Sequence, residues 1–316
     1  MGYARISVSP YPERRGRANP PYEASPMLIT SAIVTGVALG SMYGLIALGF
    51  HITYVVSRTV NFAQGSSMML GAVLGYTLAV RYGLPYPLAA VATLLLCAAF
   101  GLVVERTLVR PFAERGSDAW LMATVAGGIV LDNIVLFTFG KEPRSFPSFL
   151  AQKPVEIFGT GVYPLQLVIP LVGLGAALAL HLAFRRTRYG KALLAVVQNK
   201  DAARLMGIDV RRAIAFSFAL STALAGLAGL LIAPLFNVNS DMGTLFGIKA
   251  FAVAILGGIT SASGIVLAGL AYGLIEALVT SFFGSTYTQI VVFAVVIVAL
   301  AVMPNGLLGR AAVKKV

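Results

Sequence analysis

A few polar and ionisable side chains interrupt the long apolar runs of this sequence, and these are the residues best placed to do chemistry. Burying such groups in a nonpolar medium is costly, so they either contact a polar molecule or hydrogen-bond a neighbouring helix. Both interpretations stay open here. The candidates for the lining of a polar path are Asn61, Gln64, Asp132, Asn133, Lys249 and Glu276, with His51 as a further polar residue.

The position of each candidate within its apolar run bears on these interpretations. Asn61 stands where a helix is expected to begin, so it can also act as an ordinary capping residue. Lys249 and His51 lie near the ends of their apolar runs, where either side chain can also reach the lipid headgroups. Asp132 and Glu276 lie well inside theirs, which leaves interhelical hydrogen bonding as the alternative to a path.

Most enzymatic chemistry is excluded by what the residues lack. Lys191 follows a glycine, but Ala192 stands where an ATP-binding loop needs Ser or Thr to hold magnesium. His51 and His181 are far apart, and no His, Cys and carboxylate set has metal-ligand spacing. Cys97 is the only cysteine. No strands are expected that could carry a nucleophile elbow. The sequence therefore predicts no catalysis, no metal and no cofactor.

The composition points to a bilayer as the solvent. Of 316 residues, 58% are hydrophobic and only 11% are charged, against about 25% charged in soluble domains. A net charge of +12 would suggest nucleic acid as the partner of a soluble protein. Here the cations stand between apolar runs, which is typical of cytoplasmic loops. We expect no nucleic-acid partner.

Apolar runs of about 20 residues predict membrane-spanning helices. The segment 248–258 is too short to cross alone, and we expect it to end inside the protein at the turn "GGITSASG". The predicted fold is an all-α integral membrane protein: a polytopic bundle of about eight transmembrane helices, one short helix that can re-enter, and a cytoplasmic coupling helix. The eight spans lie near 28–56, 61–80, 87–109, 120–139, 164–184, 210–236, 264–283 and 286–303.

The domain organisation follows from these runs. Residues 1–26 hold no apolar core and are expected to be a disordered basic tail, with Met27 as an alternative natural start. We expect one transmembrane domain over 27–312, followed by a short tail, 313–316. Gly36, Gly40 and Gly44 recur at the four-residue interval that lets helices approach closely in lipid.

The segment 185–212 is the most basic part of the chain. It carries eight Lys and Arg against two Asp, which leaves +6, half of the net charge of the whole chain. This assigns the segment to the cytoplasm, together with the connection 105–118, and places 140–163 outside. The basic C-terminus also favours the cytoplasm. That requires 248–258 to count as a crossing or the span 264–283 to turn back, a conflict that remains open here.

Within the basic segment, "DAARLMG" at 201–207 has the form of the Glu-Ala-Ala-x-x-x-Gly signature of ABC importer permeases. Four longer stretches extend this likeness. The chain resembles the branched-chain amino acid ABC transporter permeases (the Liv type) over nearly all of 27–312. These stretches are "GSMYGLIALGFHITYVVSRTVNFAQGSSMMLGA" (40–72), "VERTLVRPF" (104–112), "GIKAFAVAILGGITSASGIVLAGLAYGLIEAL" (247–278) and "VMPNGLLGR" (302–310).

One motif departs from the family pattern. The family's Asn-Phe-Ala-His-Gly-Glu is present as "NFAQGS", so Gln64 replaces the His and Ser66 replaces the Glu. A charge-dependent role at these two positions is therefore in doubt. The departure also loosens the choice of cargo, because permeases for urea and short amides are similar to this family.

The resemblance implies a transport subunit, not an enzyme, in a bacterial cytoplasmic (inner) membrane. The implied partners are a second homologous permease, two cytoplasmic ABC ATPases and an extracytoplasmic substrate-binding protein, with a branched-chain or other hydrophobic amino acid as cargo. One alternative is a similar permease for urea or short amides, and another is a stand-alone ion-coupled transporter or channel. The residues expected to couple to an ATPase are Asp201, Ala202, Ala203, Arg204 and Gly207.

Overall fold

The computed structural model describes residues 26–151, 153–157 and 160–309. Within these ranges, seven helices are long and apolar enough to cross a membrane. They are α1 (Pro26–Ser57), α3 (Tyr86–Val104), α5 (Trp120–Phe139), α6 (Pro164–Arg186), α9 (Val210–Ile232), α11 (Ala262–Phe283) and α12 (Ser285–Val302). With the shorter apolar helix α10 (Met242–Gly257), they confirm the predicted all-α bundle of about eight helices.

Helix α2 (Gln64–Tyr76) departs from the pattern of the other predicted spans. It continues through a π-helical turn, Thr77–Arg81. Most of α2 is buried by protein, including its polar first turn. A helix surrounded by protein needs no apolar outer surface, so α2 can be more polar than helices that face lipid. A second π-helical turn, Glu105–Val109, joins α3 to the short helix α4 (Arg110–Ala113).

The connection 140–163 contains one element that the sequence did not predict. A 3₁₀ turn (Phe149–Ala151) is followed by β1 (Val155–Ile157) and β2 (Thr160–Val162), which form an antiparallel pair with Val155 opposite Val162. The expectation of no strands was therefore wrong for this connection. A segment this short shows little hydrophobic periodicity, yet a local hairpin satisfies its backbone hydrogen bonds.

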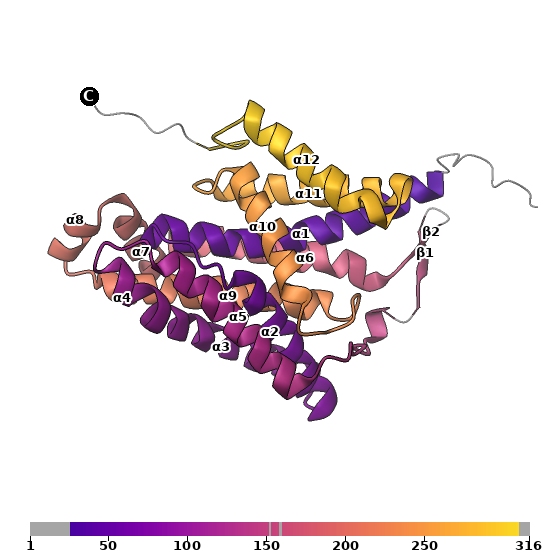
Figure 1. Ribbon diagram of the computed structural model, residues 1–316, viewed down its shortest axis with the longest axis horizontal. Helices are drawn as coiled ribbons and strands as arrows, with labels where there is room; N and C mark the ends of the chain where they lie inside the picture. The colour runs from indigo at the N-terminus through magenta and orange to yellow at the C-terminus, as the bar shows by residue number, and fades with distance from the viewer. Residues whose placement is uncertain (1–25, 152, 158–159, 310–316) are drawn as a thin grey trace, which may run out of the picture.

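The two ends of the bundle carry different structural elements (Figure 1). The helices α4, α7 (Arg188–Gln198) and α8 (Lys200–Leu205) gather at one end, called the basic end below, and the β1–β2 hairpin lies at the other. The basic end is held together by polar contacts. Lys200 Nζ donates to the carbonyl of Ser57 at 3.1 Å, and Arg211 pairs with Glu114 at 2.9 Å.

The path of α10 determines at which end of the bundle α1 begins and α12 ends. Helix α9 leads away from the basic end, and α10 leads back toward it (Figure 1). His51, near the basic end of α1, places Nδ1 2.8 Å from the carbonyl of Ile259, just beyond α10. The segment 248–258 is thus part of the longer helix α10, which counts as a crossing when the orientation of the chain is traced. Helix α1 then begins at the end opposite the basic end, and α12 returns the chain to the basic end.

The core of the bundle is the contact of α1 with α11. A Cβ added to Gly40 would lie 2.6 Å from the carbonyl oxygen of Gly269, and one added to Gly36 would lie 2.8 Å from Cα of Leu274. A Cβ on Gly44 would meet only an ordinary contact at 4.0 Å. Two of the three glycines in the predicted stripe therefore stand where the backbones are too close for any side chain.

The predicted tails fall almost entirely on residues 1–25 and 310–316, which lie outside the described residues.

Candidate translocation path and coupling surface

Lys249 and Glu276 form an ion pair in the interior of the bundle. Lys249 Nζ lies 2.5 Å from Glu276 Oε1, and the two residues are only 6% and 8% exposed. Tyr43 from α1 lies beside them, with its hydroxyl 3.5 Å from Lys249 Nζ and its ring packed edge-on against Tyr272 at 5.4 Å. The pair therefore ties α10 to α11 and α1.

This burial decides between two interpretations of the sequence. Lys249 and His51 were both placed near lipid headgroups as an alternative, but both are buried in protein, and His51 is 8% exposed. Helix α10 begins seven residues before Lys249, which moves Lys249 from the apparent end of an apolar run to mid-helix. Each of these groups has an interior partner instead of water.

A separate pocket of about 270 Å³ contains Asp132. It lies between α1, α2, α5 and α10, and one Oδ1 of Asp132 is buried with no hydrogen-bond partner among the described residues. Ser66 interacts with the Asp132 carboxyl group and also lines the pocket. Three phenylalanines supply the apolar wall: Phe50, Phe62 and Phe251.

The pocket combines features that suit a particular ligand. A lone carboxylate attracts an ammonium group, and aromatic rings favour both apolar groups and cations. A small molecule with an amine and an apolar side chain fits both. A buried oxygen without a hydrogen-bond partner is costly, which makes Oδ1 of Asp132 a candidate contact for a ligand.

The other predicted path residues are distributed differently. Gln64 is fully buried, donates through Nε2 to the carbonyl of Ser221 at 3.0 Å and accepts from the Ser221 hydroxyl at 3.0 Å. Asn61 accepts from the backbone NH of Ala63 at 3.1 Å in the turn before α2, so it does not cap the helix, whose N-cap is Ala63; its Nδ2 has no partner among the described residues. Asn133 is exposed and donates to Ile129 of its own helix at 2.8 Å.

The structure thus separates the six path candidates instead of joining them. Lys249 and Glu276 form one interior cluster, Asp132 lines a pocket, and Gln64 fastens α2 to α9. Asn133 points away from the pocket on the exposed side of α5. Sequence reasoning missed the three phenylalanines of the pocket, because nothing in an apolar run distinguishes a ring that lines a cavity.

The basic segment folds as two short helices. Thr187 accepts from the backbone NH of Gly190 at 2.9 Å and caps α7. Asn199 interrupts the helix and accepts from the backbone NH groups of Asp201 and Ala202, both at 3.0 Å, to begin α8. Gly207 follows with φ +81, a conformation that favours glycine and ends the turn. These capping residues explain why this polar stretch is helical outside the apolar core.

The inner side of α8 is fixed to the rest of the chain. Ala203 is 3% exposed and packs in a small cluster with Val56 and Val210. Lys200 bonds to the end of α1. Burial, together with the nearby charges of Arg58 and Arg204, lowers the pKa of Lys200. Ala203 was predicted to meet a partner, but its side chain faces the protein's own interior and is not available for that contact.

The outer side of α8 is exposed. Asp201, Ala202 and Arg204 are accessible, and two large apolar side chains follow them: Leu205 is 89% exposed and Met206 is 82% exposed. Large apolar groups this exposed outside the membrane mark contact sites. The sequence carried a signal for them, since two long apolar residues stand directly before the helix-ending glycine in a polar segment.

A polar cleft of about 500 Å³ lies beside α8. It is crossed by ion pairs, with Arg110 bound to Glu105 at 2.7 Å and Arg211 bound to Glu114 at 2.9 Å. Lys200 and Arg204 from α8, Ser57 from α1 and Ile214 from α9 also line it. The outer side of α8 and this mixed-charge cleft together make up the candidate coupling surface, called the coupling surface from here on.

Comparison with known proteins identifies the family to which this chain is similar. Residues 32–300 match the family model described as branched-chain amino acid transport system / permease component. The high-affinity branched-chain amino acid transport system permease protein LivH of Escherichia coli (strain K12) is 34% identical, over 89% of this chain and 96% of that relative. The corresponding protein BraD of Pseudomonas aeruginosa is 33% identical over 90% and 97%.

Among solved structures, PsaBC from Streptococcus pneumoniae superposes with a TM-score of 0.48 and 15% identity, over 86% of this chain and 91% of that one. The family model and both relatives cover almost the whole transmembrane region. The resemblance predicted from the four motifs is confirmed, and the chain belongs to the family of branched-chain amino acid transport system permease components.

Proposed function

We propose that this chain is the membrane-spanning permease subunit of an ATP-driven importer for branched-chain or other hydrophobic amino acids, in a cytoplasmic (inner) membrane. The observation that carries the proposal is the similarity to LivH and BraD over nine-tenths of the chain. The seven apolar helices supply the multi-pass architecture that such a subunit requires.

The Asp132 pocket supports this choice of cargo. A hydrophobic amino acid carries an ammonium group for Asp132 and an apolar side chain for Phe50, Phe62 and Phe251. Urea and short amides can donate N–H groups to the carboxylate of the half-buried Asp132, but they are neutral and would leave its charge uncompensated. An ion-coupled carrier is less well supported, because Lys249 and Glu276 are paired with each other instead of facing a pocket.

Replacing Asp132 with asparagine tests the pocket. We expect ATP-driven uptake of leucine into proteoliposomes by the complete importer to fall about tenfold or more, because an interaction with a charged group contributes roughly 1.5–3 kcal/mol. The neighbouring change Asn133→Ala is the control, since Asn133 is exposed and bonds only within its own helix. Equal uptake by Asp132→Asn and Asn133→Ala would remove Asp132 from the path.

The proposed partners are a second homologous permease, two cytoplasmic ABC ATPases and an extracytoplasmic binding protein. The coupling surface is the proposed contact with an ATPase. Leu205 and Met206 would insert into the partner, with Asp201, Ala202 and Arg204 around them, while Gly207 shapes the turn and the buried Ala203 holds α8 in place. An exposed apolar pair at the end of α8, a helix held to α1 by the Lys200 bond, suits a contact that transmits movement.

Charged replacement of the apolar pair tests this contact. We expect Leu205→Asp with Met206→Asp to lower co-purification of the ATPase, and ATP-driven uptake, at least tenfold, because buried apolar anchors dominate interface energies. Phe149→Asp is a matched control, since Phe149 is 86% exposed in the 3₁₀ turn that precedes the β1–β2 hairpin. Normal ATPase recovery with the double variant would contradict the docking role. Uptake that proceeds without ATP would contradict the proposed function itself.

A further inference from the structure

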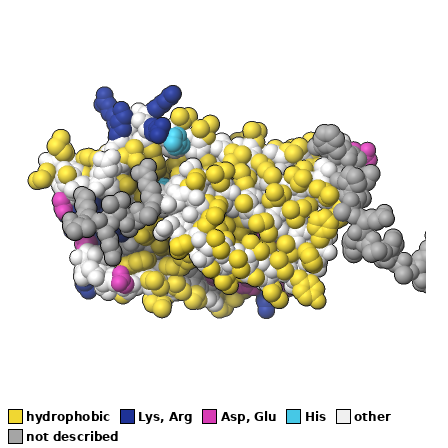
Figure 2. Space-filling model, turned by 90° about the horizontal axis from the view of Figure 1, so that it is seen from above, with side chains coloured by type: hydrophobic (Ala, Val, Ile, Leu, Met, Phe, Trp, Pro, Cys, Tyr) yellow, Lys and Arg dark blue, Asp and Glu magenta, His cyan; other side chains and the backbone are white. Residues whose placement is uncertain are grey.

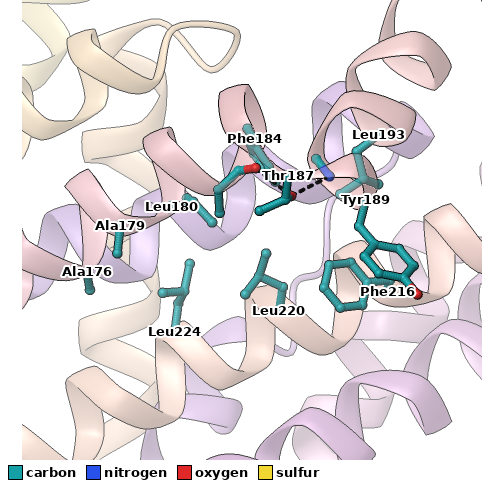
Figure 3. A pocket seen from close by; sticks show the side chains of 12 residues that line it. Ala176, Ala179, Leu180, Phe184, Thr187, Tyr189, Leu193, Phe216, Leu220 and Leu224 are labelled. Carbon is teal, nitrogen blue, oxygen red and sulfur yellow. Dashed lines mark hydrogen bonds between the residues drawn. The ribbon is translucent and has the colours of Figure 1, made fainter.

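An apolar groove runs between α6 and α9, and it shares no lining residue with the Asp132 pocket. Its volume is about 550 Å³, and its walls come from the halves of α6 and α9 nearer the basic end (Figure 3). Ala179, Leu180 and Phe184 line it from α6, and Leu220 and Leu224 face them from α9. Both helices are long and apolar enough to cross a membrane, which places the groove at the depth of the hydrocarbon core.

The groove continues toward the basic end. Tyr189, Leu193 and Phe216 line both this groove and a second hollow of about 360 Å³. Tyr189 is 82% exposed, and Figure 3 shows its ring beside that of Phe216 at one end of the groove. Tyrosine is enriched where hydrocarbon meets headgroups. The second hollow, which also contains Arg212, therefore lies at headgroup depth.

Positive charge is concentrated in the segment that lines the two hollows. In the part of the chain that the structure describes, four exposed cations of this segment take part in no ion pair: Arg185, Arg186, Arg188 and Lys191. Arg188 and Lys191 bracket the groove-lining Tyr189 in sequence. One carboxylate is present, since Asp209 pairs with Arg212 at 3.0 Å. Figure 2 shows Lys and Arg side chains projecting at this end beside a largely hydrophobic surface.

We propose that the α6–α9 groove is a binding site for an anionic phospholipid. One acyl chain fills the apolar groove, and the phosphodiester lies against Arg188, Lys191 and Arg212. Dispersion contacts alone would not select a lipid, because any acyl chain is already in hydrocarbon. Selection comes from the cations, since each Lys or Arg near an anionic surface contributes roughly fivefold in binding. The site is independent of the transported molecule.

The test is native mass spectrometry of the full chain in a mild detergent, after incubation with equal amounts of phosphatidylglycerol and phosphatidylcholine of matched chain length. We expect the wild type to retain phosphatidylglycerol with about a tenfold preference or more. Ala179→Trp fills the groove and should reduce retention at least fivefold. Leu178→Trp is the matched control, because Leu178 is 59% exposed on the adjacent position and does not line the groove.

A second pair of variants tests whether the cations bind the lipid headgroup, without altering the packing of the groove. Arg188→Gln with Lys191→Gln should abolish the preference for phosphatidylglycerol. Arg106→Gln with Arg115→Gln removes the same charge from exposed residues of the 105–118 connection and should leave it unchanged. Equal retention of both lipids by the wild type would overturn the proposal. Loss of a co-purifying second permease with Ala179→Trp, at unchanged lipid retention, would instead make the groove a subunit interface and would also overturn it.

Discussion

Replacing Lys249 with methionine is expected to lower the free energy of unfolding by about 3–5 kcal/mol, because it leaves the buried carboxylate of Glu276 without its partner. The two groups meet at 2.5 Å with less than a tenth of either residue exposed, so water cannot compensate for the loss. The second oxygen of Glu276 already has no partner among the described residues. Thermal unfolding in detergent, followed by size exclusion, measures the effect.

The double variant Lys249→Met with Glu276→Leu separates the pair from its neighbours. Replacing a buried ion pair by apolar residues of similar volume is often neutral or stabilising, so the double variant should recover most of the loss. A single variant as stable as the wild type would show that the pair does not hold α10 against α11. ATP-driven uptake by a stable double variant would also remove the pair from any ion-coupling mechanism.

Replacing Gly40 with alanine is expected to destabilise the protein by about 1–3 kcal/mol, because the added methyl group meets the backbone of α11 and forces the helices apart. The nearest atom, the carbonyl oxygen of Gly269, would lie 2.6 Å away and cannot move independently of its helix. The measurement is again the unfolding temperature of the purified chain in detergent.

Gly44 provides a control with the opposite expected sign. It lies one turn further along the same helix, where an added Cβ has ordinary clearance of 4.0 Å. Alanine favours a helix over glycine by about 1 kcal/mol, so Gly44→Ala should be neutral or slightly stabilising. Equal destabilisation by both changes would mean that the α1–α11 contact does not depend on the close approach seen at Gly40.

The sequence predicted the features that depend on composition over many residues. Apolar runs located the long helices, and the excess of cations located the basic end. The span predicted at 61–80 is helical, but α2 begins at Gln64, buries a polar turn and is not among the seven helices long and apolar enough to cross a membrane. Two of the three predicted packing glycines stand at a close contact, because small residues at four-residue intervals act through local helix geometry.

The features that the sequence did not predict depend on which helices become neighbours. Lys249 and Glu276 are 27 residues apart, and nothing in either run indicates that they pair. Asp132 was selected as a costly buried group, but its phenylalanine neighbours come from three other elements. Ala203 was expected from a motif to couple to an ATPase, whereas α8 turns that residue inward, since a side chain's direction depends on how the helix docks.

The bond from Lys200 to the end of α1 has a mechanical consequence. Helix α1 has 32 residues, which at 1.5 Å per residue gives a rod about 48 Å long, more than the roughly 30 Å of the hydrocarbon core. One end of this rod is fastened to α8, and its middle carries Tyr43 beside the ion pair and Gly40 against α11. A small tilt imposed on α1 at α8 would therefore be transmitted along the helix to the centre of the membrane.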